Sequence, residues 1–112
     1  MSRLSKTLSA LKSERKKSLV TFLVAGDPNL EQSLDLMHVM AQSGADVIEL
    51  GVPFPDPKAE GPVIQKAHER ALKKNISLNS CFDLVRRFRE INDTTPVVLM
   101  GYMDSVGTFG FE

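Results

Sequence analysis

Two glutamates, Glu49 and Glu60, are the residues whose type and spacing could support acid–base chemistry. Glu49 lies near the end of a short apolar run, 45–50 (ADVIEL), and Glu60 follows eleven positions later, directly before Gly61-Pro62. A carboxylate beside a buried strand must be solvated, paired or protonated, because burying an unpaired charge is costly. Two carboxyl groups whose environments separate their pKa values could act as general acid and general base.

Structural roles would also explain both glutamates. A strand that ends early would leave Glu49 solvated, whereas the carboxyl end of a parallel strand is where α/β proteins bind ligands. Glu60 could stabilise the N-terminus of the helix that follows it by interacting with the helix dipole. From these residues alone, both alternatives stay open.

The elements that must position the glutamates alternate between strands and helices. Apolar runs rich in β-branched residues predict strands near 18–25, 45–50 and 96–100. Apolar residues at helical spacing predict helices over 5–17, between an Asn29 cap and Gly44, from Pro62 to near Lys73, and over 79–91. This alternation implies right-handed crossovers and a parallel sheet, either doubly wound or part of a barrel.

Most other distinctive side chains are assigned to structure. Phe82, Val85 and Phe88 share one side of the last predicted helix, so Phe82 and Phe88 are predicted to pack in the core. His38 and His68 lie on helices without a second ligand at metal-binding spacing. We therefore predict no metal site, and expect both histidines to be at the surface or partly buried.

Composition excludes several classes of function. The 112 residues are 42% hydrophobic and 25% charged, which is typical of one globular domain. Lys+Arg and Asp+Glu are equal at 14 each, so a nucleic-acid partner is not expected. No apolar run approaches the roughly 20 residues of a membrane span. The single cysteine, Cys81, cannot form an internal disulfide, and with no signal peptide in view we predict a cytoplasmic location.

A longer motif surrounds the two glutamates. The segment 46–65, DVIELGVPFPDPKAEGPVIQ, resembles the signature of the tryptophan synthase α-subunit family. The segments 21–28 (TFLVAGDP) and 96–102 (PVVLMGY) match the same family at the expected places along the chain. Within the signature, Pro55 replaces a serine, Lys58 an apolar residue and Glu60 an aspartate.

The resemblance implies the N-terminal part of a (β/α)8 TIM barrel, with about three parallel strands and their flanking helices. It implies a lyase of tryptophan biosynthesis that cleaves indole-3-glycerol phosphate to indole and glyceraldehyde 3-phosphate by a retro-aldol reaction. The family needs no metal or organic cofactor for this reaction. Its indole passes to a tryptophan synthase β subunit in an α2β2 heterotetramer.

The resemblance also assigns roles by position. Glu49 would be the acid/base that serves the indole carbon being protonated, and Glu60 the acid that interacts with the indole N–H. The other implied residues line the indole pocket (Phe22, Met100 and Tyr102) or lie in a loop that closes the site and meets the β subunit (Pro53 and Asp56).

A complete TIM barrel needs about 250 residues and usually binds phosphate with loops after its seventh and eighth strands. We therefore expect one partial-barrel domain over 1–112 that is inactive by itself. Two other hypotheses are a small non-catalytic α/β protein-interaction module and a phosphosugar-binding half-barrel that pairs with another copy. Strand alternation predicts that Glu49 and Val47 face the barrel interior, and that Ile48 and Leu50 face the helices.

Overall fold

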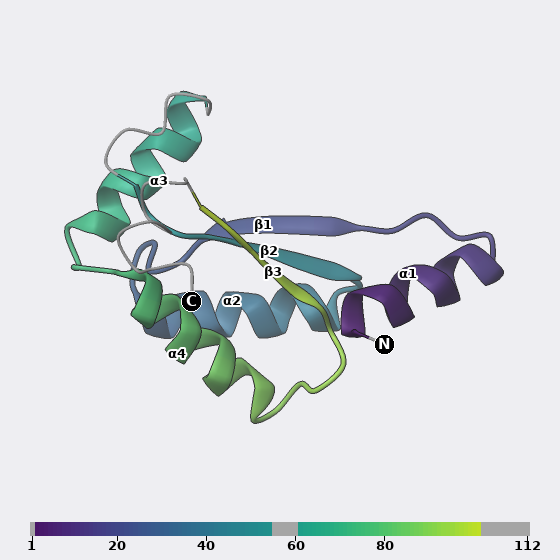
Figure 1. Ribbon diagram of the computed structural model, residues 1–112. Helices are drawn as coiled ribbons and strands as arrows, with labels where there is room; N and C mark the ends of the chain where they lie inside the picture. The colour runs from purple at the N-terminus through teal and green to yellow at the C-terminus, as the bar shows by residue number, and fades with distance from the viewer. Residues whose placement is uncertain (1, 55–60, 102–112) are drawn as a thin grey trace.

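The computed structural model describes residues 2–54 and 61–101 (Figure 1). Its elements, in chain order, are α1 (Arg3–Ser13), β1 (Val20–Val24), α2 (Leu30–Gln42), β2 (Val47–Gly51), α3 (Pro62–Leu72), α4 (Leu78–Arg89) and β3 (Val97–Met100).

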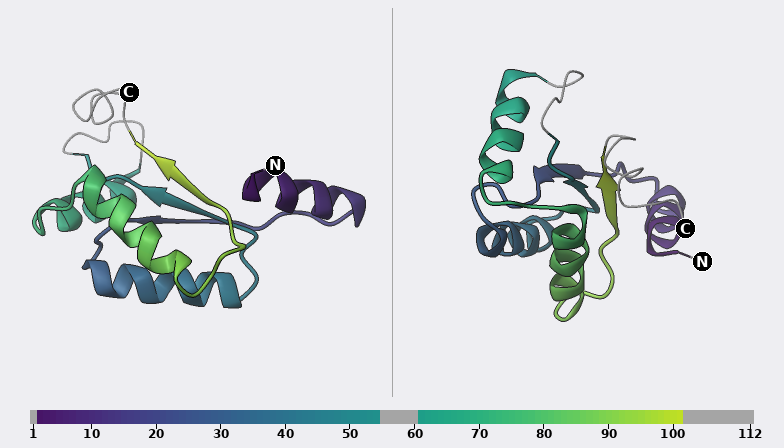
Figure 2. Two further views of the ribbon diagram at one scale, coloured as in Figure 1. Left: turned by 60° about the horizontal axis from the view of Figure 1, so that its bottom comes forward. Right: turned by 60° about the vertical axis from the view of Figure 1, so that its left-hand side comes forward.

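The three strands form one parallel sheet in the order β1-β2-β3, so that β2 is central. The sheet is open, and in the right-hand view of Figure 2 helix α2 lies between α3 and α4 on one side of it. The predicted α/β class with three parallel strands is therefore confirmed. Parallel order places the carboxyl ends of all three strands at the same edge of the sheet, which is the edge where Glu49 was expected.

The helix boundaries follow from local capping. Asn29 accepts a hydrogen bond from the amide of Gln32 at the start of α2, and Gly44 adopts a φ of +112° just beyond the end of that helix, as predicted for both residues. At the start of α4, the side chains of Ser77 and Ser80 each accept from the other residue's amide. These caps satisfy amide groups that the helix itself leaves without partners.

The core lies between the sheet and the helices. Ile48 and Leu50 of β2 are fully buried there, and they belong to the same cluster as Met37 of α2 and Phe88 of α4. Because side chains alternate along a strand, Glu49 points to the other, helix-free face. The predicted orientation of Glu49 relative to Ile48 and Leu50 therefore agrees with the structure.

Two predictions about helices were wrong in detail. Phe82 is 43% exposed, because the buried stripe of α4 runs through Cys81, Leu84 and Phe88, and Phe82 lies beside that stripe. The first helix ends at Ser13 rather than at residue 17, since Arg15 takes a left-handed φ of 58° that closes the helix.

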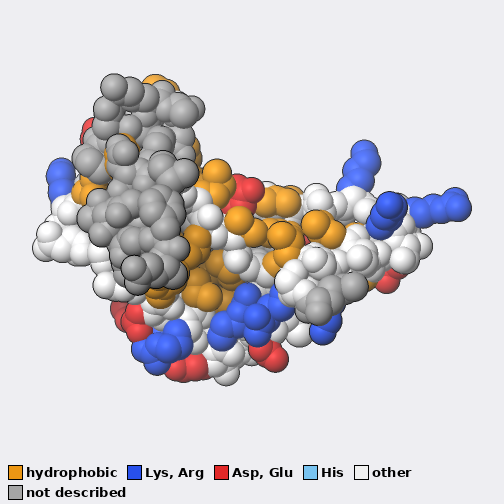
Figure 3. Space-filling model, viewed as in Figure 1, with side chains coloured by type: hydrophobic (Ala, Val, Ile, Leu, Met, Phe, Trp, Pro, Cys, Tyr) orange, Lys and Arg blue, Asp and Glu red, His pale blue; other side chains and the backbone are white. Residues whose placement is uncertain are grey.

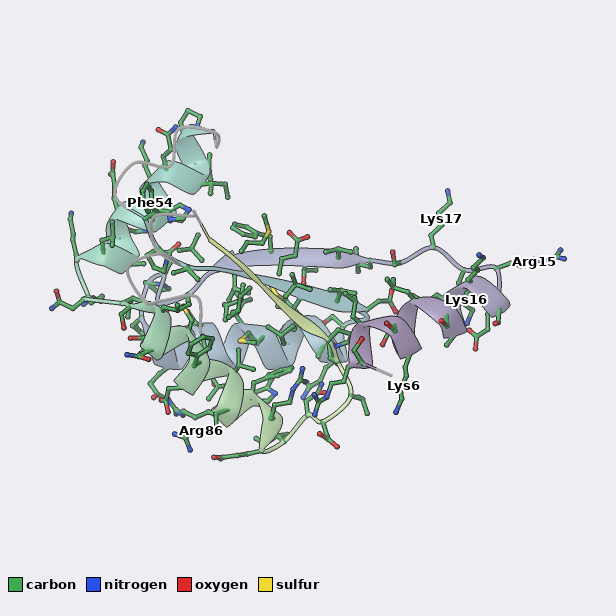
Figure 4. The ribbon with its side chains drawn as sticks, viewed as in Figure 1. Lys6, Arg15, Lys16, Lys17, Phe54 and Arg86 are labelled. Atoms are coloured by element: carbon green, nitrogen blue, oxygen red, sulfur yellow. The ribbon has the colours of Figure 1, made fainter. Side chains whose placement is uncertain are left out.

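Helix α1 contains no buried residue and projects beyond the amino ends of the strands. Two basic side chains after it, Arg15 and Lys17, extend away from the rest of the chain in Figure 4. Apolar side chains gather in the middle of Figure 3, and charged side chains lie below them and to their right. None of the described helices is long and apolar enough to cross a membrane.

Candidate active site

Glu49 lies in the middle of the open sheet face, two residues before the end of β2. It pairs in register with Phe22 of β1 on one side and with Val98 of β3 on the other. Glu49 is half-buried, whereas its neighbours Ile48 and Leu50 are fully buried on the opposite face. The carboxyl group is therefore flanked by apolar side chains from both neighbouring strands and remains accessible from the open face.

Phe22 shares this face with Glu49, and its ring crosses onto β2. The Cζ atom of Phe22 lies 2.9 Å from the position that a Cβ atom would occupy on Gly51. Real Cβ atoms essentially never approach a neighbour so closely, so the ring position requires a residue without a side chain at 51. The Phe22 ring therefore forms an aromatic surface next to Glu49 on the same face of the sheet.

Met100 brings the third strand into the same region. It pairs in register with Gly51, and its carbonyl accepts the amide of Val52 at 2.7 Å. The Met100 side chain is 43% exposed at the end of β3. Two of the three predicted indole-pocket residues, Phe22 and Met100, thus lie around the same short stretch of β2 that carries Glu49.

The chain leaves β2 along a buried path. Val52 and Pro53 are buried, and the amide of Phe54 donates to Nδ1 of His68 on α3 at 3.0 Å. His68 is only 2% exposed, so the expectation of a surface or partly buried residue was wrong. In Figure 4, Phe54 is labelled beside α3.

A helical pattern could have revealed the burial of His68. Ala67 and Ala71 are buried on α3, and Ile64 packs against the core. His68 follows Ala67 and lies one turn after Ile64, so it shares the apolar side of the helix. Residue type alone suggested a polar position, but the hydrogen bond to Phe54 allows the imidazole to be buried.

The exit of β1 is fixed beside the exit of β2. The amide of Gly26 donates to the buried Ser33 hydroxyl at 2.9 Å. Asp27 receives two hydrogen bonds from the Arg70 guanidinium, at 2.6 and 2.9 Å. This pair joins the loop after β1 to helix α3, and the interaction with Asp27 raises the pKa of Arg70. The carboxyl edge of the sheet is therefore held by side chains from α2 and α3.

Three predicted site residues lie outside the described residues: Glu60, Asp56 and Tyr102. Pro53 is described, and it is buried. Within residues 2–54 and 61–101, no group of three or more His, Cys, Asp or Glu side chains could hold a metal ion.

The described geometry provides one accessible carboxyl group next to an aromatic ring and a thioether. Such a face suits a flat, apolar substrate that needs a proton delivered to it or removed from it.

Comparison with known proteins identifies the relatives of this chain. The sequence profile of the family described as tryptophan synthase alpha chain matches residues 8–112. The tryptophan synthase alpha chain of Leptothrix cholodnii is 56% identical over 110 residues, which are 98% of this chain and 41% of the relative. That of Methylibium petroleiphilum is 54% identical over 112 residues, or 100% of this chain and 41% of the relative.

Solved structures agree in fold. A crystal structure of tryptophan synthase subunit alpha from Legionella pneumophila superposes with a TM-score of 0.96 at 51% identity, covering 98% of this chain and 42% of that chain. A tryptophan synthase complex from Pyrococcus furiosus gives a TM-score of 0.77 at 41% identity, covering 83% of this chain and 38% of that chain. The 112 residues thus span about two-fifths of the length of these relatives.

Proposed function

Because the chain belongs to the tryptophan synthase alpha chain family, we propose that it forms the N-terminal part of a TIM-barrel lyase that cleaves indole-3-glycerol phosphate. The observation that carries the proposal is the position of Glu49, accessible on the helix-free face between Phe22 and Val98. The products would be indole and glyceraldehyde 3-phosphate.

Cleavage of this substrate requires its indole ring to accept an electron pair. Glu49 would donate a proton to the ring carbon that carries the glycerol phosphate chain, which turns the ring into an electron-accepting iminium. The Glu49 carboxylate would then take the proton of the adjacent hydroxyl group. The electrons of that O–H bond form the aldehyde C=O, the C–C bond breaks, and its electron pair restores the aromatic indole. Glu49 ends the cycle protonated, as it began.

Other residues would support these steps. Glu60, whose carboxylate would accept the indole N–H, would stabilise the positive charge that develops on the protonated ring. Phe22, Met100 and Tyr102 would contact the flat indole surface. These proton transfers and one C–C cleavage would need neither a metal nor an organic cofactor.

A β-subunit partner belongs to the same proposal. The Pyrococcus furiosus structure that resembles this chain is described as a tryptophan synthase complex. The loop containing Pro53 and Asp56 would meet that partner, which would consume the indole. A cytoplasmic location would suit both the pathway and Cys81, which is a free, buried thiol.

The 112-residue chain alone is expected to be inactive, because phosphate binding orients the substrate as well as holding it. We propose to test this with a completed chimera, defined as residues 1–112 of this chain followed by the remaining segment of the Legionella pneumophila relative. The completed chimera should release indole from indole-3-glycerol phosphate. The 112-residue chain and the relative's remaining segment, each assayed separately, are the controls.

Indole release by the completed chimera and not by its separate parts would support the proposal. An inactive but well-folded chimera would contradict it. Turnover by the 112-residue chain alone, within a few-fold of the chimera, would show that our expectation for the isolated chain is wrong. Sedimentation of the isolated chain in the same experiment tests the alternative of a half-barrel that pairs with a second copy.

A further inference from the structure

The hydrogen bond between Phe54 and His68 joins the chain that leaves β2 to helix α3. The donor is the backbone amide of Phe54 and the acceptor is Nδ1 of His68, at 3.0 Å and fourteen residues apart. The His68 side chain is 2% exposed. A polar group buried this deeply costs free energy unless it is hydrogen-bonded, so the contact with Phe54 helps to account for an imidazole at this position.

The direction of this hydrogen bond defines which tautomer of the His68 imidazole makes it. An amide can only donate, so Nδ1 of His68 must carry a lone pair. The neutral ring then carries its proton on Nε2. The interaction therefore depends on an acceptor at one defined atom of the side chain, which is a requirement that substitutions can test.

The bond continues a series of contacts along β2. The amide of Ile48 donates to the carbonyl of Pro96 at 3.0 Å, and that of Val52 donates to the carbonyl of Met100 at 2.7 Å. Amides two residues apart on an extended chain point the same way, but the next one, Phe54, donates to a side chain of α3 instead of to a carbonyl of β3. Pro53 lies between Val52 and Phe54 and has no amide proton to contribute.

We propose that His68 is a positioning residue that fixes where the chain leaves β2, at the rim of the open face that carries Glu49. It touches no substrate and acts through the Phe54 backbone. This inference deepens the proposed function and rests on it, because the course of the chain after Glu49 matters to catalysis only if Glu49 is the acid/base.

Three substitutions test whether the hydrogen-bond acceptor of residue 68 matters, or only the volume of its side chain. His68→Asn keeps an acceptor atom bonded to Cγ, as Nδ1 is in histidine. His68→Gln moves the acceptor one atom farther out, and His68→Leu keeps an apolar volume without an acceptor. Asn is a poorer helix former than Gln or Leu, so helix stability alone predicts that His68→Asn is the worst of the three. The proposed role predicts that it is the best.

The first measurement is amide hydrogen exchange at Phe54 in the 112-residue chain, with Val52 as the internal reference. Protection of Phe54 should fall about tenfold in His68→Leu and His68→Gln, which is the loss expected for one buried hydrogen bond, and should be largely restored in His68→Asn. A scalar coupling across the hydrogen bond between the Phe54 amide nitrogen and Nδ1 should be visible only with histidine present. Equal protection in all variants, or loss in His68→Asn as large as in His68→Leu, would overturn the proposal.

The second measurement is turnover by the completed chimera with the same three substitutions. We expect kcat to fall several-fold in His68→Leu and His68→Gln and to recover in His68→Asn. If Phe54 protection follows the predicted order but kcat does not change, His68 is structural only and the positioning role is overturned. If the chimera with His68 intact is inactive, the proposed function fails, and Phe54 exchange alone decides whether His68 fixes the exit of β2.

Discussion

The ring of Phe22 lies across the backbone of Gly51, with its Cζ atom 2.9 Å from the place of a Cβ atom on that glycine. Phe22 also pairs in register with Glu49, two residues before Gly51. One side chain thus covers the strand beside the candidate catalytic carboxyl group, and it can do so because residue 51 has no side chain.

Gly51→Ala should therefore displace the Phe22 ring. The ring end can swing aside, so the stability cost should be modest, about 1 kcal/mol, at the low end for overpacking. Ring-proton chemical shifts of Phe22 and a urea unfolding curve measure the two effects. Gly101→Ala is the matched control, because a Cβ there would lie 3.4 Å from Val52, an ordinary contact distance. Unchanged Phe22 shifts in Gly51→Ala would contradict this description of the site.

Gly26→Ala should be much more damaging. Gly26 has a φ of +85°, and a Cβ atom there would lie 2.2 Å from Cγ1 of Ile76. Backbone strain and overpacking together should lower the free energy of unfolding by about 3 kcal/mol. Ile76→Ala removes the clashing atoms, so the double substitution should be less destabilising than the sum of the single ones. Strict additivity in urea unfolding would show that the two residues do not meet.

The pair of Glu31 and Arg87 should make stability depend on pH. The Arg87 guanidinium donates two hydrogen bonds to Glu31, at 2.7 and 2.9 Å, and this interaction lowers the pKa of Glu31 from its ordinary 4.5. A carboxyl group whose pKa is lower in the folded state contributes stability above its unfolded pKa. That contribution is lost as the pH falls from 4.5 through the lower folded value.

Thermal melts between about pH 6 and about pH 3 test this expectation. Glu31→Gln should reduce the acid-induced loss of stability, and Asp35→Asn on the same helix serves as the charge-matched control. The difference should shrink at high salt, because both partners are at the surface. An identical pH profile for Glu31→Gln and the unsubstituted chain would show that the pair contributes nothing in solution.

The reactivity of the Cys81 thiol should show whether α4 packs stably against the sheet. It is fully buried, and burial raises the pKa of its thiol to about 11. The thiolate is the reactive form, so an aromatic disulfide reagent near pH 8 should react slowly with the folded chain and rapidly in urea. Fast reaction without denaturant would mean that α4 does not pack stably on the sheet when the chain is produced by itself.

Local signals predicted most of the fold. Asn29, Gly44 and Pro62 marked helix ends because caps depend on a few adjacent residues. Strand positions followed from runs of β-branched residues, and strand alternation gave the orientation of Glu49. These features needed no knowledge of distant contacts.

Features that depend on distant partners were missed. The helical spacing of His68 placed it on the apolar side of α3, but its hydrogen-bond partner, the Phe54 amide fourteen residues away, does not follow from that spacing. The exposure of Phe82 depends on which side of α4 meets the sheet. Likewise, the register that places Phe22 beside Glu49 is a property of strand pairing. The family resemblance supplied the pocket assignment of Phe22 and Met100, which the spacing of residues could not have provided.

The most direct test of the central claim is the effect of Glu49→Gln on turnover by the completed chimera. Gln keeps the size of the side chain but can neither deliver nor accept a proton at the substrate. We expect kcat for indole release to fall by at least about 100-fold, as for the loss of a general acid–base group, while KM and thermal stability change little. A kcat within about threefold of the unsubstituted chimera would contradict the assignment of Glu49 as the acid/base.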